Sequence, residues 1–223
     1  MRRNGKDGDL KGIGSEIYFM RKYNRSVKLF RNILTNRNDN RGGVSMRKIL
    51  VVVDMQNDFV DGALGTPEAV SIVPAVRNRI LQYPEEDRYA TMDTHGENYE
   101  KTQEGTNLPV RHCIRGTEGW KLVPQIDSLI PENHRIYKPS FGSEELAQDM
   151  KALAETGGEE LRIELIGVCT DICVVSNALL LKAALPEVRV TVDPACCAGT
   201  TPEAHEAALL TMRSCQVEMA LSE

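Results

Sequence analysis

Short runs of β-branched and other apolar residues alternate with helix-like stretches along residues 46–223 of this chain. The candidate strands are residues 48–53, 88–92, 134–137, 161–166 and 188–192, with a shorter sixth at 216–220. The candidate helices are residues 72–82, 119–127, 143–155, 172–184 and 202–214. Strands that alternate with helices form βαβ units around a mainly parallel sheet. We therefore predict a three-layer α/β fold, with a doubly wound sheet of five or six strands between two helical layers.

The first 45 residues differ from the rest of the chain in charge. The whole chain carries −5, but residues 1–45 carry a net +7 and residues 46–223 carry −12. The longest apolar run of this basic leader covers residues 17–20, which is shorter than the roughly 7–15 residues of a signal-peptide core. We exclude residues 1–45 from the predicted domain and expect little order there. Three interpretations of this leader are an organellar transit peptide, a disordered tail and a segment upstream of a natural start at Met46, and we favour the last.

Composition limits the partners and the compartment. The acidic charge of residues 46–223 argues against nucleic-acid binding, because phosphate contacts need a basic face. No apolar run approaches the roughly 18 residues of a membrane span. The six cysteines are unevenly spaced and do not form the disulfide framework of a small secreted protein. We expect reduced thiols, a cytoplasmic location and a small-molecule substrate, and we leave the formation of a homo-oligomer open.

Chemically useful side chains follow four of the predicted strands. Asp54 follows the first strand, Asp93 and His95 follow the second, and Lys138 follows the third. Residues 167–173, which end in a cysteine, follow the fourth. Because ligands bind beyond the carboxyl ends of parallel strands, we expect these groups to meet in one site.

Cys173 is the candidate nucleophile of this site. It lies at the predicted start of a helix, where the positive end of the helix dipole lowers the pKa of a thiol, and a nearby Lys138 would act in the same direction. Asp54 can take the thiol proton and return it to a leaving amine. The backbone amides of Cys169 and Cys173 are the predicted donors to the oxyanion. A buried structural cysteine is the alternative, and the coincidence of three strand ends argues against it.

A second cluster of side chains is a candidate metal site. Its four candidate ligands are Asp93, His95, Glu104 and His112. Two imidazoles and two carboxylates suit Zn²⁺, Mn²⁺ or Fe²⁺ without selecting one of them firmly. Glu97 and Glu100 compete for the place of Glu104, and the spacing alone leaves a polar surface loop as an equal alternative.

Three segments of the chain resemble the isochorismatase-like cysteine hydrolases and, within them, the nicotinamidases. They are residues 49–59, which include Asp54, residues 137–142, which include Lys138, and residues 167–174, which include Cys173. The resemblance covers essentially all of residues 46–223 and implies the isochorismatase-like hydrolase fold. It also implies a catalytic triad of Asp54, Lys138 and Cys173, and a cis peptide bond between Val168 and Cys169.

The resemblance also implies a substrate and a role for the metal. Residues 93–113 resemble the metal-binding segment of nicotinamidases, which hydrolyse nicotinamide to nicotinate and ammonia through a cysteine thioester in NAD salvage. One divalent ion is implied, and zinc is favoured over manganese and iron. In the family this ion also binds the pyridine nitrogen of the substrate.

In the family, two residues enclose the pyridine ring of the substrate, and only one of them has a match in this chain. Phe59 matches one wall of the site for the pyridine ring. An aromatic residue often forms the other wall shortly before the last metal histidine. This chain has Leu108 at the start of that segment, and we predict Phe59 and Leu108 as the substrate-binding residues. Trp120 is a candidate to approach the ring from elsewhere.

Two alternative functions remain open. One is a metal-independent amidase of this family acting on another small amide or carbamoyl compound, and the other is a non-catalytic α/β protein that binds a metal or another ligand.

Overall fold

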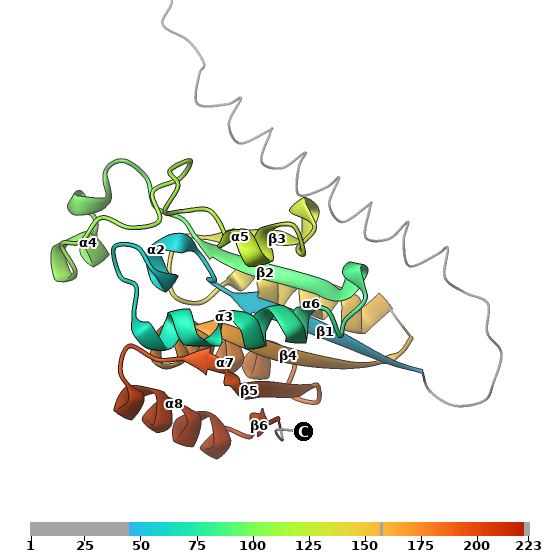
Figure 1. Ribbon diagram of the computed structural model, residues 1–223. Coiled ribbons are helices and arrows are strands. Elements are labelled where there is room, and N and C mark those ends of the chain that lie inside the picture. Colours follow the sequence, from blue (N-terminus) through green and yellow to red (C-terminus); the bar gives the residue numbers. More distant parts are fainter. Residues whose placement is uncertain (1–44, 157, 221–223) are drawn as a thin grey trace, which may run out of the picture. The chain divides into compact units, whose positions relative to one another are not determined.

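A computed structural model describes residues 45–156 and 158–220, so the predicted leader lies outside the described residues except for Ser45. The described residues contain a six-stranded sheet of order β3-β2-β1-β4-β5-β6, in which all neighbouring strands run parallel (Figure 1). The strands are β1 (Met46–Val53), β2 (Arg88–Asp93), β3 (Arg135–Lys138), β4 (Glu160–Val168), β5 (Arg189–Ala198) and β6 (Glu218–Met219).

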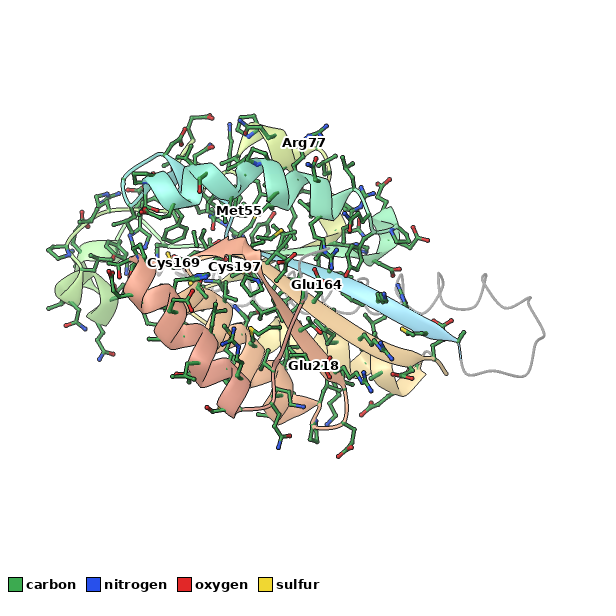
Figure 2. The ribbon with its side chains drawn as sticks, turned by 60° about the horizontal axis from the view of Figure 1, so that its bottom comes forward. Met55, Arg77, Glu164, Cys169, Cys197 and Glu218 are labelled. Carbon is green, nitrogen blue, oxygen red and sulfur yellow. The ribbon has the colours of Figure 1, made fainter. Side chains whose placement is uncertain are left out.

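Helices cover both faces of this sheet. One layer contains α2 (Asn57–Val60), α3 (Pro67–Ile80) and α5 (Pro124–Asp127), and the other contains α6 (Glu144–Thr156), α7 (Val175–Ala184) and α8 (Pro202–Ser214). Figure 2 shows α3 on one side of the sheet and α8 on the opposite side. This arrangement confirms the predicted three-layer α/β fold.

The central strand β1 explains why the apolar runs of the sequence are continuous. Residues 49–53 of β1 are completely buried, because strands pair on both edges and helices cover both faces. A strand that is covered on both faces needs apolar side chains at every position rather than at alternate ones. Within the described part of the chain, none of the helices is long and apolar enough to span a bilayer.

The strand order reverses between β1 and β4, and this reversal fixes where a ligand site can form. The carboxyl ends of these two neighbouring strands lie together, and Figure 2 shows Met55 and Cys169, which follow them, toward the same end of the sheet. Gly167 in β4 has a φ of 118°, and a Cβ atom there would lie 2.1 Å from the carbonyl oxygen of Val53. Only glycine therefore lets the two strands end so close together.

Three predicted helices begin several residues from their expected starts, and one of them, α7, begins at Val175 instead of residue 172. Helix α3 begins at Pro67 instead of residue 72, because the Thr66 hydroxyl accepts a hydrogen bond from the Ala69 amide and caps the helix. The helix predicted over residues 119–127 is reduced to α5, which begins at Pro124. A residue that precedes proline is disfavoured in helical conformation. In addition, the carbonyls of Gly119 and Lys121 accept hydrogen bonds from the segment that follows β1.

Candidate active site

The structure brings Asp54, Lys138 and Cys173 together at the carboxyl ends of β1, β3 and β4. The Nζ atom of Lys138 lies 2.6 Å from Oδ2 of Asp54 and 3.5 Å from Sγ of Cys173. The side chains of Asp54 and Lys138 have no exposed surface, and Cys173 is also buried. The three predicted catalytic residues therefore form one compact and buried cluster.

Backbone and side-chain contacts fix the orientation of Asp54. The residue has a φ of 50°, in the left-handed region, and its amide donates to the carbonyl of Thr91 on β2. The hydroxyl of Thr91 in turn donates to Oδ1 of Asp54 at 2.7 Å. Because Thr91 occupies one carboxylate oxygen, the other is directed to Lys138.

The pKa of the Cys173 thiol is raised rather than lowered, which corrects the expectation from its place near a helix start. Burial raises this pKa, the Asp54 carboxylate raises it further, and Lys138 acts in the opposite direction. The protonated form of the resting thiol is therefore favoured. Burial also raises the pKa of Asp54, although Lys138 opposes this shift. A carboxylate with a raised pKa is the better base for this thiol.

Cys173 lies in a π-helical turn, Thr170–Val174, that precedes α7. The carbonyl of Cys169 accepts hydrogen bonds from the amides of Ile172 and Val174, so the turn closes on itself. The peptide bond between Val168 and Cys169 is cis, as the resemblance implied. The amides of Cys169 and Cys173 thus belong to one closed turn around the nucleophile, and their role as oxyanion donors stays a prediction.

The four predicted metal ligands also come together. One ligand atom from each of Asp93, His95, Glu104 and His112 lies within 4.8 Å of the other three. Asp93 ends β2, Glu104 lies on the short helix α4 (Gln103–Asn107), and both histidines lie in the loops beside them. The competing Glu97 and Glu100 instead form ion pairs with the exposed Arg111. Glu104 is therefore the acid that the fold directs to the cluster.

The state of the two imidazoles tests whether a cation fits this cluster. Nδ1 of His112 lies 2.8 Å from the carbonyl oxygen of Val110, which can only accept, so Nδ1 carries a proton and Nε2 is the nitrogen that faces the cluster. Nε2 of His95 is buried and makes no hydrogen bond of good geometry within the described residues, although Oδ2 of Asp93 lies 2.8 Å away. Two inward nitrogen donors and two carboxylates fit Zn²⁺, Mn²⁺ or Fe²⁺.

The charges of the cluster support the same conclusion. Burial disfavours charged histidines, yet the carboxylates of Asp93 and Glu104 raise the pKa of His95 to about 9 and that of His112 to about 10. His112 and His95 lower the pKa of Glu104 to about 2. The carboxylates of Asp93 and Glu104 thus stabilise two positive charges in this cluster. A divalent cation supplies the same charge as the two imidazolium protons.

Asp93 joins the two clusters. Its Oδ1 lies 3.4 Å from Nζ of Lys138, and its Oδ2 lies 2.8 Å from Nε2 of His95. The cluster of the candidate nucleophile and the candidate metal centre therefore meet at this carboxylate, and a small ligand held at one of them lies beside the other.

Aromatic side chains surround the metal ligands. The ring of Phe59 lies 5.4 Å from that of His112, which places this predicted substrate residue beside the candidate metal centre. Leu108 is partly exposed, and its carbonyl accepts from the Tyr99 hydroxyl. Tyr99 is completely buried and packs against the rings of both candidate histidine ligands. Trp120 instead donates to Thr94 and packs on Tyr137.

Gln56 is a site residue that the sequence reasoning missed. It is completely buried, and its side-chain amide accepts from the Asp93 amide at 2.8 Å and donates to the Asp93 carbonyl at 2.9 Å. The backbone of a metal ligand is therefore fixed by a residue that lies two positions after Asp54. Its only sequence signal is a polar side chain directly after a buried strand.

Replacing His112 by alanine is expected to weaken zinc binding at least about 100-fold, because one of two nitrogen ligands is lost. Equilibrium dialysis with zinc measures this directly and needs no substrate. The matched control is His134→Ala, which removes a buried histidine that stacks on Tyr89 outside the cluster. His112→Ala with the zinc affinity of the unaltered protein would contradict the assignment of the ligands.

Comparisons with known proteins agree with this geometry. The family model of the isochorismatase domain matches residues 48–223. A nicotinamidase/pyrazinamidase of Mycobacterium tuberculosis is 27% identical over 189 residues, which are 78% of this chain and 99% of that protein. A protein of Arabidopsis thaliana named "Probable inactive nicotinamidase" is 27% identical over 184 residues, 76% of this chain and 89% of its own length.

A solved structure gives the same result for the fold. The pyrazinamidase of Pyrococcus horikoshii, determined in complex with zinc, has a TM-score of 0.64 and 29% sequence identity, and the match covers 78% of this chain and 99% of that one. Three observations therefore indicate the same family: the strand order, the position of the site at the ends of β1 and β4, and the match of the family model. This chain belongs to the isochorismatase domain family, and within that family it is similar to the nicotinamidases.

Proposed function

We propose that this protein is a nicotinamidase that converts nicotinamide and water to nicotinate and ammonia, as a step of NAD salvage. The observation that carries this proposal is the shared carboxylate of Asp93, which lies 3.4 Å from Lys138 and belongs to the four-ligand cluster. A nucleophilic thiol suits a carboxamide carbon. A cation site beside it suits a ring nitrogen of the same small substrate.

The first half of the reaction forms a thioester. Asp54 takes the proton of the Cys173 thiol as sulfur attacks the carboxamide carbon, and the carbonyl oxygen becomes an oxyanion. The amides of Cys169 and Cys173 donate to this oxyanion. Asp54 then returns the proton to the amide nitrogen, and the C–N bond breaks. Ammonia leaves, and the acyl group stays on the Cys173 sulfur as a thioester.

The second half hydrolyses the thioester. Asp54 takes a proton from water, and the hydroxide attacks the acyl carbon. The C–S bond breaks, nicotinate is released, and the proton returns to Cys173. Throughout both halves the Lys138 ammonium faces Asp54 and the sulfur, where it stabilises the negative charge that passes between them.

The four-ligand cluster would hold the divalent cation through Asp93, His95, Glu104 and His112. When bound, this cation supplies a Lewis-acidic centre to which the pyridine nitrogen can coordinate. Phe59, beside His112, offers its ring as one wall for the pyridine. Zinc is favoured because the zinc-bound pyrazinamidase is similar to this chain.

Ammonia release is expected from nicotinamide and pyrazinamide, and chelation is expected to lower the rate at least about tenfold, with recovery on addition of zinc. The test is an ammonia assay on these two amides and a carbamoyl compound, each with and without chelator. A rate on nicotinamide that is indifferent to chelation would contradict the anchoring role of the cation. Preferential hydrolysis of the carbamoyl compound would contradict the proposed substrate.

A further inference from the structure

Asn177 is a completely buried polar side chain that the proposed reaction does not use. It lies on α7, one helical turn after Cys173. Its Nδ2 donates to the carbonyl of Cys173 at 2.8 Å and to the carbonyl of Phe141 at 3.2 Å. Its Oδ1 accepts from the amide of Ser143 at 3.0 Å. All three partners are backbone groups.

The chemistry of these partners fixes the orientation of the amide. Two carbonyl oxygens can only accept and an N–H group can only donate, so Nδ2 must face the carbonyls and Oδ1 must face Ser143. A buried amide with three hydrogen bonds of this kind is a rigid connection. An isosteric aspartate cannot replace it, because a carboxylate would face two carbonyl oxygens.

The three hydrogen bonds of Asn177 join the turn Thr170–Val174 to residues 139–143, here called the lysine loop. The lysine loop directly follows Lys138, whose Nζ donates to the carbonyl of Ser140 at 3.1 Å. At its far end the Ser143 hydroxyl accepts from the Leu146 amide in the first turn of α6. The lysine loop packs so tightly on α7 that a Cβ atom on Gly142 would lie 2.4 Å from Cδ1 of Leu180.

Lys138 ends β3 and Cys173 lies in the turn after β4. These two strands are not neighbours in the sheet, so sheet hydrogen bonds between them do not set the 3.5 Å between Nζ and Sγ. Asn177 holds the carbonyl of Cys173 on one side and two backbone groups of the lysine loop on the other. Asn177 therefore holds the turn that contains Cys173 against the lysine loop, whose Ser140 carbonyl accepts from the Lys138 ammonium.

We infer that Asn177 is a positioning residue that sets the distance between the Cys173 sulfur and the Lys138 ammonium. This inference rests on the proposed function for its kinetic consequence. Its geometric consequence, the environment of the Cys173 thiol, can be measured without a substrate.

The first test is kinetic. Asn177→Ala removes all three hydrogen bonds, and we expect kcat for nicotinamide to fall at least about tenfold with KM changed less than about twofold, since misplaced reacting groups slow the chemical step. In Asn177→Ser the hydroxyl can still donate to the carbonyl four residues earlier, which is that of Cys173, but both bonds to the lysine loop are lost. We expect an intermediate kcat for this variant.

The control for a merely structural role is Thr66→Ala, which removes the cap of α3 far from the lysine loop in sequence and costs about 1 kcal/mol. Both variants are assayed below their melting transitions. If Thr66→Ala loses as much kcat as Asn177→Ala, or if Asn177→Ala keeps kcat within about twofold, the inference is overturned.

The second test measures alkylation by iodoacetamide, with peptide mass spectrometry separating Cys173 from the exposed Cys215 as an internal reference. We expect the Cys173-to-Cys215 rate ratio to fall at least about threefold in Asn177→Ala, because the thiolate loses the nearby ammonium. An unchanged or increased ratio would show that Asn177 does not position Lys138. A protein that releases no ammonia from nicotinamide would refute the proposed function, whereas the alkylation ratio would still decide this inference.

Discussion

Replacing Cys173 by alanine is expected to lower ammonia release from nicotinamide by a factor on the order of 10⁴ or more, because the sulfur that forms the acyl intermediate is lost. Sγ of Cys173 lies 3.5 Å from Nζ of Lys138, and Nζ lies 2.6 Å from Oδ2 of Asp54, so the proposed base and the stabilising charge both lie at this sulfur. The measurement is single-turnover ammonia release at saturating zinc. Zinc stoichiometry is expected to stay unchanged, because Cys173 is not a member of the four-ligand cluster.

The control for this variant is Cys215→Ala, which removes the exposed thiol after α8 and is expected to keep full activity. A Cys173→Ala protein that retained more than about one per cent of the rate would contradict the nucleophile assignment. Loss of both activity and zinc would instead show that the substitution had disturbed the whole site, so both quantities are measured on the same preparation.

Replacing Asp54 by asparagine is expected to remove activity and also to destabilise the fold. General acid–base help is worth about 10²–10⁴ in rate, and Asp54 carries every proton transfer in the proposed cycle. The variant leaves the completely buried Lys138 ammonium without the carboxylate oxygen at 2.6 Å. Breaking a buried ion pair in this way costs about 3–5 kcal/mol. Thermal denaturation and the ammonia assay measure the two effects separately.

The double variant Asp54→Asn with Lys138→Met separates stability from catalysis. Removing both charges leaves no buried ammonium beside a neutral residue 54, and Asp93 keeps the two histidines at its Oδ2 atom. We therefore expect most of the lost stability to return while activity stays absent. If the double variant were as unstable as the single one, the ion pair would not be the source of the lost stability. If Asp54→Asn kept the rate of the unaltered protein, Asp54 could not be the base.

The sequence predicted the site well where the fold alone determines proximity. Asp54, Asp93, Lys138 and Cys173 directly follow, or lie a few residues after, parallel strands, and the carboxyl ends of parallel strands meet at one edge. The alternation of strands and helices was therefore enough to bring these residues together. The structure confirms that they meet within a few ångströms.

The residues that the sequence missed depend on backbone partners from distant segments. Gln56 binds the backbone of Asp93 and Asn177 binds the lysine loop, and neither contact has a periodicity or a spacing that reveals it. The pKa of Cys173 was also predicted in the wrong direction. A helix start was visible in the sequence, but the complete burial beside Asp54 that raises this pKa was not.

The most direct test of the proposed thioester is the intact mass of the protein after a brief reaction with nicotinamide and an acid quench. We expect a nicotinoyl adduct that peptide mapping places on Cys173 and that disappears in Cys173→Ala. Ammonia release with an adduct on another residue would contradict the assignment of Cys173. Ammonia release at the full rate from Cys173→Ala, with no covalent adduct in either protein, would contradict the thioester mechanism itself.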